Sequence, residues 1–118
     1  MNTLTIIAIS IVIFLQTCFM VFEMFLWNTA TGQKIFGLSK DFAGQSATLA
    51  ANQGLYNGFL AAGLLWGLVS TGGFDALIFF LSCIIIADLY GAITASTMIL
   101  FLQALPAAVA MILLILNH

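Results

Sequence analysis

The stretch FDALIFFLSCIIIADLYGAITA, residues 74–95, decides the fold class of this chain. It is apolar and as long as an α-helix must be to cross the hydrocarbon core of a bilayer, which takes roughly 20 residues. Beyond its first turn it carries one charged side chain, that of Asp88. We therefore predict a membrane-spanning helix here, with an acidic residue inside it.

Three further apolar stretches surround this segment, and we predict helices over about 3–28, 44–70 and 97–117. The turn Thr71-Gly72-Gly73 ends the second helix, and Ser96-Thr97 forms a very short turn before the last one. The predicted fold is all-α and integral to the membrane: an up-and-down bundle of four transmembrane helices, with residues 1–118 forming a single domain.

The composition supports this fold class. Hydrophobic residues make up 64% of the 118 residues and charged residues 5%, which leaves too little polar surface for a soluble globule. The lipid bilayer is the expected surroundings of the chain, and no room remains for a soluble catalytic domain. Because the chain lacks a basic patch, we expect no nucleic-acid partner.

The connection from Asn28 to Phe42 holds both lysines of the chain, Lys34 and Lys40. Positive charges favour the cytoplasmic side, so we predict a cell-membrane, multi-pass protein with this connection in the cytoplasm and both termini outside. An inverted or dual topology is the alternative. The apolar run 35–38 predicts either a segment that dips into the membrane interface or an ordinary loop packed on the bundle.

Polar side chains gather toward the predicted cytoplasmic ends of all four helices. At about 1.5 Å per residue, Glu23 lies ~8 Å and Asp88 ~10 Å from those ends. The layer predicts a polar cavity open toward the cytoplasm. The predicted ligand-binding or proton-carrying residues are Glu23, Asn52, Gln53, Tyr56, Asn57 and Asp88. The predicted supporting residues are Gln16, Trp27 and Gln103.

Glu23 and Asp88 are candidate functional residues because burial of an ionisable side chain in a membrane costs free energy. Such side chains commonly mark an ion, proton or ligand site. Such a carboxyl group can carry a proton, act as a general acid or base, or hydrogen-bond to a polar head group. Pairing of the two carboxyl groups through a shared proton is the structural alternative.

The amide side chains of the second helix also have two interpretations. They can contact a ligand, or they can form hydrogen bonds between helices that fix the packing. We place Gly54, Gly58 and Ala61 on the other side of this helix, as a small-residue surface for close helix approach.

Several familiar sites are missing from the sequence. Cys18 and Cys83 do not form a CxxC pair, and the one histidine is His118, so we expect no metal, no haem and no other cofactor. The catalytic residues, if any exist, are unknown. Pro106 lies inside the predicted last helix, where we expect it to cause a kink.

Three runs carry a resemblance to a known family: FEMFLW at 22–27, KIFGL at 34–38 and AANQGLYNGFLA at 50–61. Together they resemble the small integral membrane proteins of domain of unknown function 1304, over essentially the whole chain. The resemblance implies four membrane helices and brings no established reaction.

The chain also resembles, more weakly, the membrane-associated eicosanoid and glutathione metabolism proteins, which are four-helix chains of similar size. That family forms trimers, so the resemblance implies a homo-oligomer, with Asn52 at the position of the family's helix-two asparagine. The arginines with which that family holds glutathione are missing from this sequence.

Three functions follow from these observations as hypotheses. The first is a bundle that binds or processes a small amphiphilic or hydrophobic molecule in its polar cavity. The second is a proton-coupled exporter that uses Glu23 and Asp88, as small multidrug transporters of this length use a membrane glutamate. The third is a structural subunit of a larger membrane complex.

Overall fold

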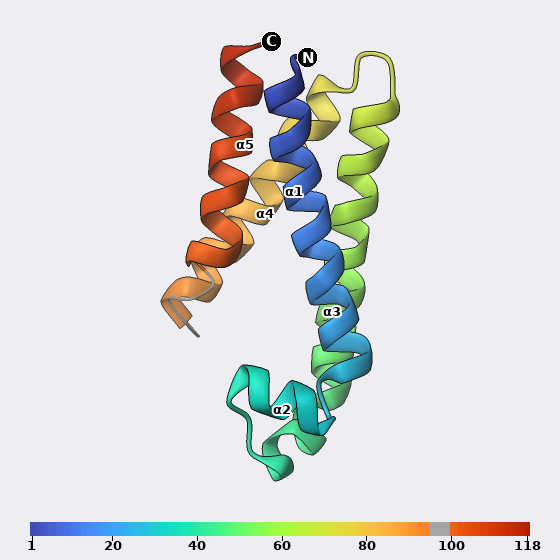
Figure 1. Ribbon diagram of the computed structural model, residues 1–118, viewed down its shortest axis with the longest axis vertical. Helices are drawn as coiled ribbons and strands as arrows, with labels where there is room; N and C mark the ends of the chain where they lie inside the picture. The colour runs from blue at the N-terminus through green and yellow to red at the C-terminus, as the bar shows by residue number, and fades with distance from the viewer. Residues whose placement is uncertain (95–99) are drawn as a thin grey trace. The chain divides into compact units, whose positions relative to one another are not determined.

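The computed structural model describes residues 1–94 and 100–118, with the backbone alone described at Leu100. The predicted turn at Ser96-Thr97 lies outside these residues. The regular elements of the described residues are all helical, so the chain is all-α as predicted (Figure 1). They are α1 (Thr3–Val21), η1 (Phe22–Leu26), α2 (Ala30–Phe36), α3 (Lys40–Val69), α4 (Phe74–Thr94), η2 (Leu100–Ala104) and α5 (Leu105–Leu116).

The described residues thus contain five α-helices and two π-helical turns, η1 and η2, where we expected four plain helices. The first predicted helix, 3–28, ends as a π-helical turn at Leu26. The second begins at Lys40 instead of 44, because the Ser39 hydroxyl accepts a hydrogen bond from the Phe42 amide and so caps an earlier helix start. The last contains a π-helical turn before Pro106.

The predicted loop between the lysines contains the short helix α2. Thr29 caps its first turn by accepting a hydrogen bond from the Gly32 amide. Gly37 ends it in the left-handed conformation, at φ 66°, which glycine adopts without steric cost. The sequence pattern predicted a loop for this segment, and the two caps instead allow it to form a helix.

The chain divides into two compact units, one of residues 1–15 and 60–118 and one of residues 16–59, which we call the terminal unit and the middle unit. The core of the terminal unit combines side chains from α1, α3, α4 and α5. Its buried members are Ile9, Val12, Leu64, Leu77, Leu81, Ile84, Ala107, Ala110 and Leu114.

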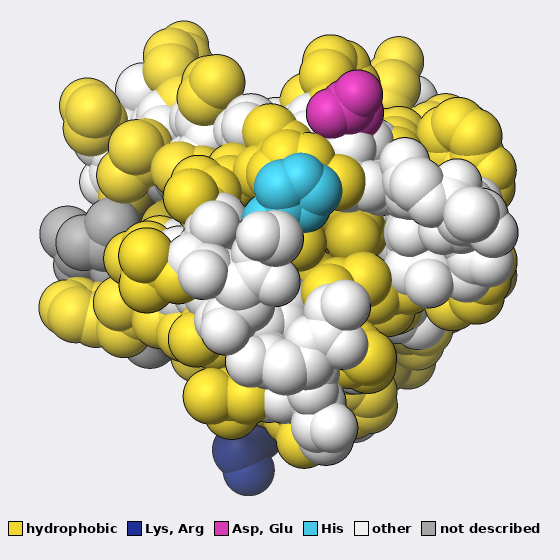
Figure 2. Space-filling view, turned by 90° about the horizontal axis from the view of Figure 1, so that it is seen from above, with side chains coloured by type: hydrophobic (Ala, Val, Ile, Leu, Met, Phe, Trp, Pro, Cys, Tyr) yellow, Lys and Arg dark blue, Asp and Glu magenta, His cyan; other side chains and the backbone are white. Residues whose placement is uncertain are grey.

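Both chain ends lie at the same end of the terminal unit (Figure 1). The Thr5 hydroxyl lies 2.7 Å from the Asn2 side-chain oxygen and 3.4 Å from the Leu113 carbonyl oxygen, which links the start of α1 to the end of α5. The rings of Phe74 and His118 stack with their centroids 3.7 Å apart. Figure 2 shows the histidine on this face, with hydrophobic side chains around it.

Two segments of the described residues are long and apolar enough to cross a membrane, Thr3–Leu26 and Phe74–Thr94. The segment Phe101–Leu116 is apolar but shorter. Helix α3, with 30 residues, is also long enough to cross a membrane, but the amide side chains of Asn52 and Gln53 lower its mean hydropathy.

Glycines allow α3 and α4 to approach closely on either side of their turn. A Cβ atom on Gly63 would lie 2.5 Å from the Phe80 ring, and one on Gly67 would lie 2.8 Å from the Leu77 side chain. A Cβ atom on Gly73 would overlap the backbone carbonyl of Gly67. The helical hairpin therefore requires glycine at its turn, because a backbone cannot move aside as a side chain can.

We predict that Gly73→Ala lowers the free energy of unfolding by about 1–3 kcal/mol, the usual cost of overpacking. Thermal unfolding in detergent measures this change. Thr71→Ala, at an exposed position of the same turn, is the control and should leave the unfolding temperature unchanged. Equal stability of the two variants would show that the turn does not require the close approach.

Candidate functional site

The first candidate site lies where α1 ends and the π-helical turn η1 begins. A π-helical turn is wider than an α-helical one. Such turns are rare in proteins, and those that occur are often found at functional sites. Glu23 is the second residue of this turn and is partly buried. The carboxyl group thus lies at a break in regular helix geometry, within an apolar segment.

A hydrogen bond connects Glu23 to α3. The side-chain amide of Asn57 donates to the Oε1 atom of Glu23 at 2.5 Å, across 34 positions of sequence. Asn57 is 6% exposed, so the bond has little competition from solvent. The hydrogen bond therefore holds one carboxyl oxygen of Glu23 in place.

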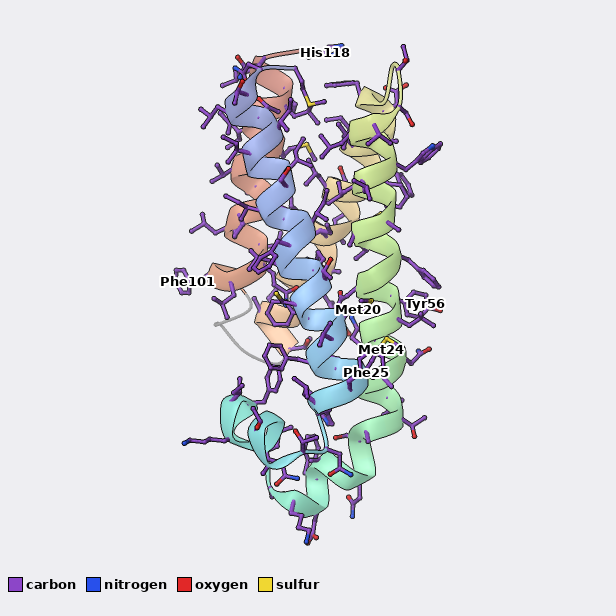
Figure 3. All side chains as sticks on the ribbon, turned by 45° about the vertical axis from the view of Figure 1, so that its right-hand side comes forward. Met20, Met24, Phe25, Tyr56, Phe101 and His118 are labelled. Atoms are coloured by element: carbon purple, nitrogen blue, oxygen red, sulfur yellow. The ribbon has the colours of Figure 1, made fainter. Side chains whose placement is uncertain are left out.

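Glycines of α3 create the short distance that this hydrogen bond needs. A Cβ atom on Gly54 would lie 3.0 Å from the Glu23 Cβ atom and 2.8 Å from the Met24 side chain. One on Gly58 would lie 2.6 Å from the sulfur atom of Met20. Met20 and Met24 lie beside α3 in Figure 3. The close approach predicted for Gly54 and Gly58 is therefore present.

Asn57 shares this packed face with the two glycines, whereas we expected it on the opposite, polar side. Its spacing explains the difference, because it follows Gly54 by three positions, which places the two residues on neighbouring parts of the helix surface. Asn52, Gln53 and Tyr56 are exposed. Tyr56 projects away from α3 in Figure 3, and its ring meets Phe59 edge-on.

Trp27, predicted as a supporting residue, anchors the end of η1. Its indole Nε1 atom donates to the Ser46 hydroxyl at 2.9 Å, and that hydroxyl lies 2.6 Å from the Phe42 carbonyl oxygen. The Phe36 ring packs against Trp27 at 5.2 Å and against Phe22 at 5.9 Å. The aromatic partners of Trp27 were not predicted, although aromatic residues on both sides of a short connection were a usable signal.

Asp88 is the acidic residue inside α4, in the terminal unit. It is 7% exposed, and its Oδ2 atom is buried without a hydrogen-bond partner among the described residues. In the middle unit the same holds for the Oε1 atom of Gln16, which is 1% exposed. Buried polar atoms usually have a partner, so each of these atoms requires an explanation.

An apolar cavity of about 360 Å³ lies against α4, η2 and α5 in the terminal unit. Among the described residues, its lining consists of Ile85, Leu89, Phe101, Ala104, Leu105 and Ala108. Gln103 lies in η2, is partly buried, and is not one of the lining residues. Pro106 follows η2, in the first turn of α5. Proline has no backbone N–H group to donate to the preceding turn, and its ring clashes with the carbonyl group four residues earlier, so regular α-helical hydrogen bonds are interrupted there.

The predicted site residues therefore divide between the two units. Glu23 and Asn57 are directly bonded in the middle unit, which also contains Asn52, Gln53, Tyr56, Trp27 and Gln16. Asp88 and Gln103 belong to the terminal unit. Each unit offers a carboxyl group in an apolar helical segment, one bonded to an amide and one with an oxygen that lacks a partner.

We predict that Asn57→Leu lowers the free energy of unfolding by about 1–3 kcal/mol, because Glu23 then loses its donor. Glu23→Gln keeps an acceptor oxygen and should cost less. The double variant Glu23→Leu/Asn57→Leu should lose less stability than the sum of its single changes, as expected for directly coupled residues. Thermal unfolding of the wild-type protein, Glu23→Leu, Asn57→Leu and the double variant tests the coupling, and strict additivity would contradict it.

Comparison with known proteins places the chain in a family. Residues 10–115 match the family described as "Protein of unknown function (DUF1304)". The chain is 31% identical over 116 residues to "Uncharacterized protein YpaA" of Lactococcus lactis subsp. lactis (strain IL1403), covering 95% of this chain and 97% of that protein. No solved structure matches the chain. The resemblance predicted from the three sequence runs is confirmed, and the chain belongs to the DUF1304 family.

Proposed function

We propose that this chain is a multi-pass membrane protein that binds a small amphiphilic or hydrophobic molecule and holds its polar group with an intramembrane carboxyl group. The observation that carries the proposal is Asp88, a buried carboxyl group in an apolar helix with a side-chain oxygen that lacks a partner. A bound molecule with a hydrogen-bond donor would satisfy that oxygen.

The charge distribution supports the same function. The only lysines, Lys34 and Lys40, lie between the two segments of the described residues that are long and apolar enough to cross a membrane, and the chain has no arginine. A carboxyl group inside either segment therefore has no lysine or arginine in that segment to pair with. Such groups in membranes typically serve substrates, ions or protons.

A proton-coupled exporter is the second candidate function, and Glu23 favours it. Its carboxyl group is only partly buried, and one oxygen is held by the Asn57 amide, so a proton can enter and leave without the side chain losing its position. Reconstituted vesicles distinguish the candidates. An exporter moves protons across the membrane when its substrate is added, whereas a binding protein does not.

We propose the topology with the connection between the lysines in the cytoplasm and the turn at Thr71-Gly72-Gly73 outside. With Cys18 and Cys83 replaced by alanine, Thr71→Cys should react with a membrane-impermeant maleimide on intact cells. Ser39→Cys should react only after the membrane is opened. Both positions are exposed. The reverse labelling pattern would contradict the orientation, and labelling of both positions on intact cells would indicate dual insertion.

We predict that a small molecule co-purifies with the protein and is lost in Asp88→Asn. Native mass spectrometry of the protein released from membranes measures the bound mass and the number of subunits together. Asp75→Asn is the matched control, because Asp75 is an exposed carboxylate in the first turn of the same helix. Retention of the molecule by Asp88→Asn at the wild-type level would show that this carboxyl group does not hold it.

A further inference from the structure

We propose that the connection between η1 and α3 presents a surface that binds anionic phospholipids where the chain leaves the membrane. Two lysines and two large apolar residues, all exposed, make up this lipid-facing surface: Lys34, Ile35, Lys40 and Phe42. The inference rests on the proposed membrane location of the chain and adds a partner to it. All four residues belong to the middle unit.

Helix α2 is fixed against the end of the apolar segment Thr3–Leu26. A Cβ atom on Gly32 would overlap the Leu26 carbonyl oxygen, so the backbones of α2 and η1 touch. The Thr29 amide donates to that same carbonyl oxygen at 3.2 Å. Helix α2 begins only four residues after Leu26, and four residues span at most about 14 Å. If the apolar segment crosses a membrane, α2 therefore lies at the surface of that membrane.

Helix α2 packs with one side and exposes the other. Gly32 is buried, and the ring of Phe36, four positions further on, lies 5.2 Å from that of Trp27, so these two residues mark the packed side. Lys34 follows Gly32 by two positions, about 200° around the helix, and lies opposite the packed side. Ile35 is 56% exposed. Packing against η1 therefore leaves a cationic and an apolar side chain of α2 uncovered.

The start of α3 repeats this combination. Lys40 is its first residue and is exposed, and Phe42 is 52% exposed, whereas the next residue, Ala43, is buried. Asp41 lies between the two and is also exposed. Its carboxylate is in the first turn of α3, where it interacts favourably with the helix dipole. Two short elements thus each expose one lysine beside one large apolar side chain.

Charge complementarity identifies the partner. The two lysines of the chain both belong to this surface, and three of the four acidic residues lie elsewhere in the sequence, at Glu23, Asp75 and Asp88. With Asp41 included, the side chains of 28–42 carry a net charge of +1, although the whole chain carries −2. The positive charge of the chain is therefore concentrated beside the end of an apolar segment, where it attracts the negative surface of a membrane.

An anionic phospholipid matches both kinds of side chain. Its phosphate group accepts hydrogen bonds from a lysine ammonium group, while its acyl chains take the apolar side chains out of water. A neutral lipid provides the acyl chains without the net charge, and a soluble polyanion provides the charge without the acyl chains. Lysine suits this position, because its long stem can lie along apolar surface while its charge stays at the head groups.

The charge test measures which lipids the full chain retains. The protein is extracted from vesicles of equal parts phosphatidylglycerol and phosphatidylcholine, and native mass spectrometry counts the bound lipids of each class. We expect more phosphatidylglycerol than phosphatidylcholine. Lys34→Gln and Lys40→Gln should each lower this lipid ratio by about fivefold, the factor equivalent to ~1 kcal/mol per lysine near an anionic surface.

Two variants are matched controls for the charge test. Lys34→Arg/Lys40→Arg keeps both positive charges and should preserve the lipid ratio. Asp41→Asn removes the one negative side chain between the lysines and should raise the ratio. A general disturbance of the connection would lower the ratio in all of these variants, so the opposite sign of Asp41→Asn isolates the effect of charge.

The embedding test determines whether the apolar side chains reach the acyl chains. With Cys18 and Cys83 replaced by alanine, a bimane fluorophore is attached to Ile35→Cys or Phe42→Cys in vesicles of phospholipid brominated on its acyl chains. Bromine quenches the fluorophore on contact, so we expect strong quenching at both positions. The same label on Lys34→Cys, an exposed position next to Ile35, should be quenched less, because lysine lies at the level of the phosphates.

The outcomes separate this inference from the proposed function. An equal lipid ratio in wild-type protein and Lys34→Gln/Lys40→Gln overturns the anionic partner, and quenching at position 35 no stronger than at position 34 overturns the embedding. A change of subunit number without a change of lipid ratio assigns the surface to a second copy of the chain and also overturns the proposal.

Alkaline washing of the vesicles tests the membrane location by itself. Protein that the wash releases does not span the membrane, and both proposals then fail. Protein that stays in the vesicles but shows no preference for phosphatidylglycerol leaves the proposed function standing and overturns the lipid-facing surface alone.

Discussion

Close approach at the glycines of α3 is the constraint on which the packing of this chain depends. In the middle unit Gly54 and Gly58 admit Glu23, Met24 and Met20, and in the terminal unit the glycines near the α3–α4 turn admit α4 side chains. Inside a bilayer, where lipid tails are as apolar as leucine, helices associate chiefly through such close contact and through hydrogen bonds. A larger side chain at these points would remove the contact and any bond that depends on it.

The hydrogen bond between Asn57 and Glu23 illustrates this dependence. The amide reaches the carboxyl group because the backbone of α3 lies close to η1 at Gly54. Asp88 has no such glycine-assisted partner among the described residues, and its Oδ2 atom remains without a bond. Glu23 and Asp88 both lie in apolar segments of the sequence. Their surroundings differ, because an amide binds one oxygen of Glu23, whereas one oxygen of Asp88 has no partner among the described residues. The proposed function uses this oxygen of Asp88.

The sequence predicted much of this arrangement, and the misses have identifiable causes. The start of α4 at Phe74 and the close approach at Gly54 followed from hydrophobic length and small-residue spacing. Helix α2 and the early start of α3 depend on single capping side chains, such as Ser39, which length and hydropathy do not detect. The partner of Glu23 was not predictable, because it depends on which face of α3 meets η1. The π-helical turns leave no hydropathy pattern at all.

The π-helical turn η1 also takes up one residue without changing the direction in which the following side chains point. A π-helical turn holds one residue more than an α-helical turn but still completes a single turn. Shortening 22–26 by one residue would therefore let an uninterrupted α-helix form with Trp27 still facing Ser46. The same deletion within α1, where no wider turn takes up the change, would rotate Trp27 by about 100° relative to the preceding part of the helix, the angle of one residue in an α-helix. A change of length is therefore tolerated at 22–26 and not in the regular helix before it.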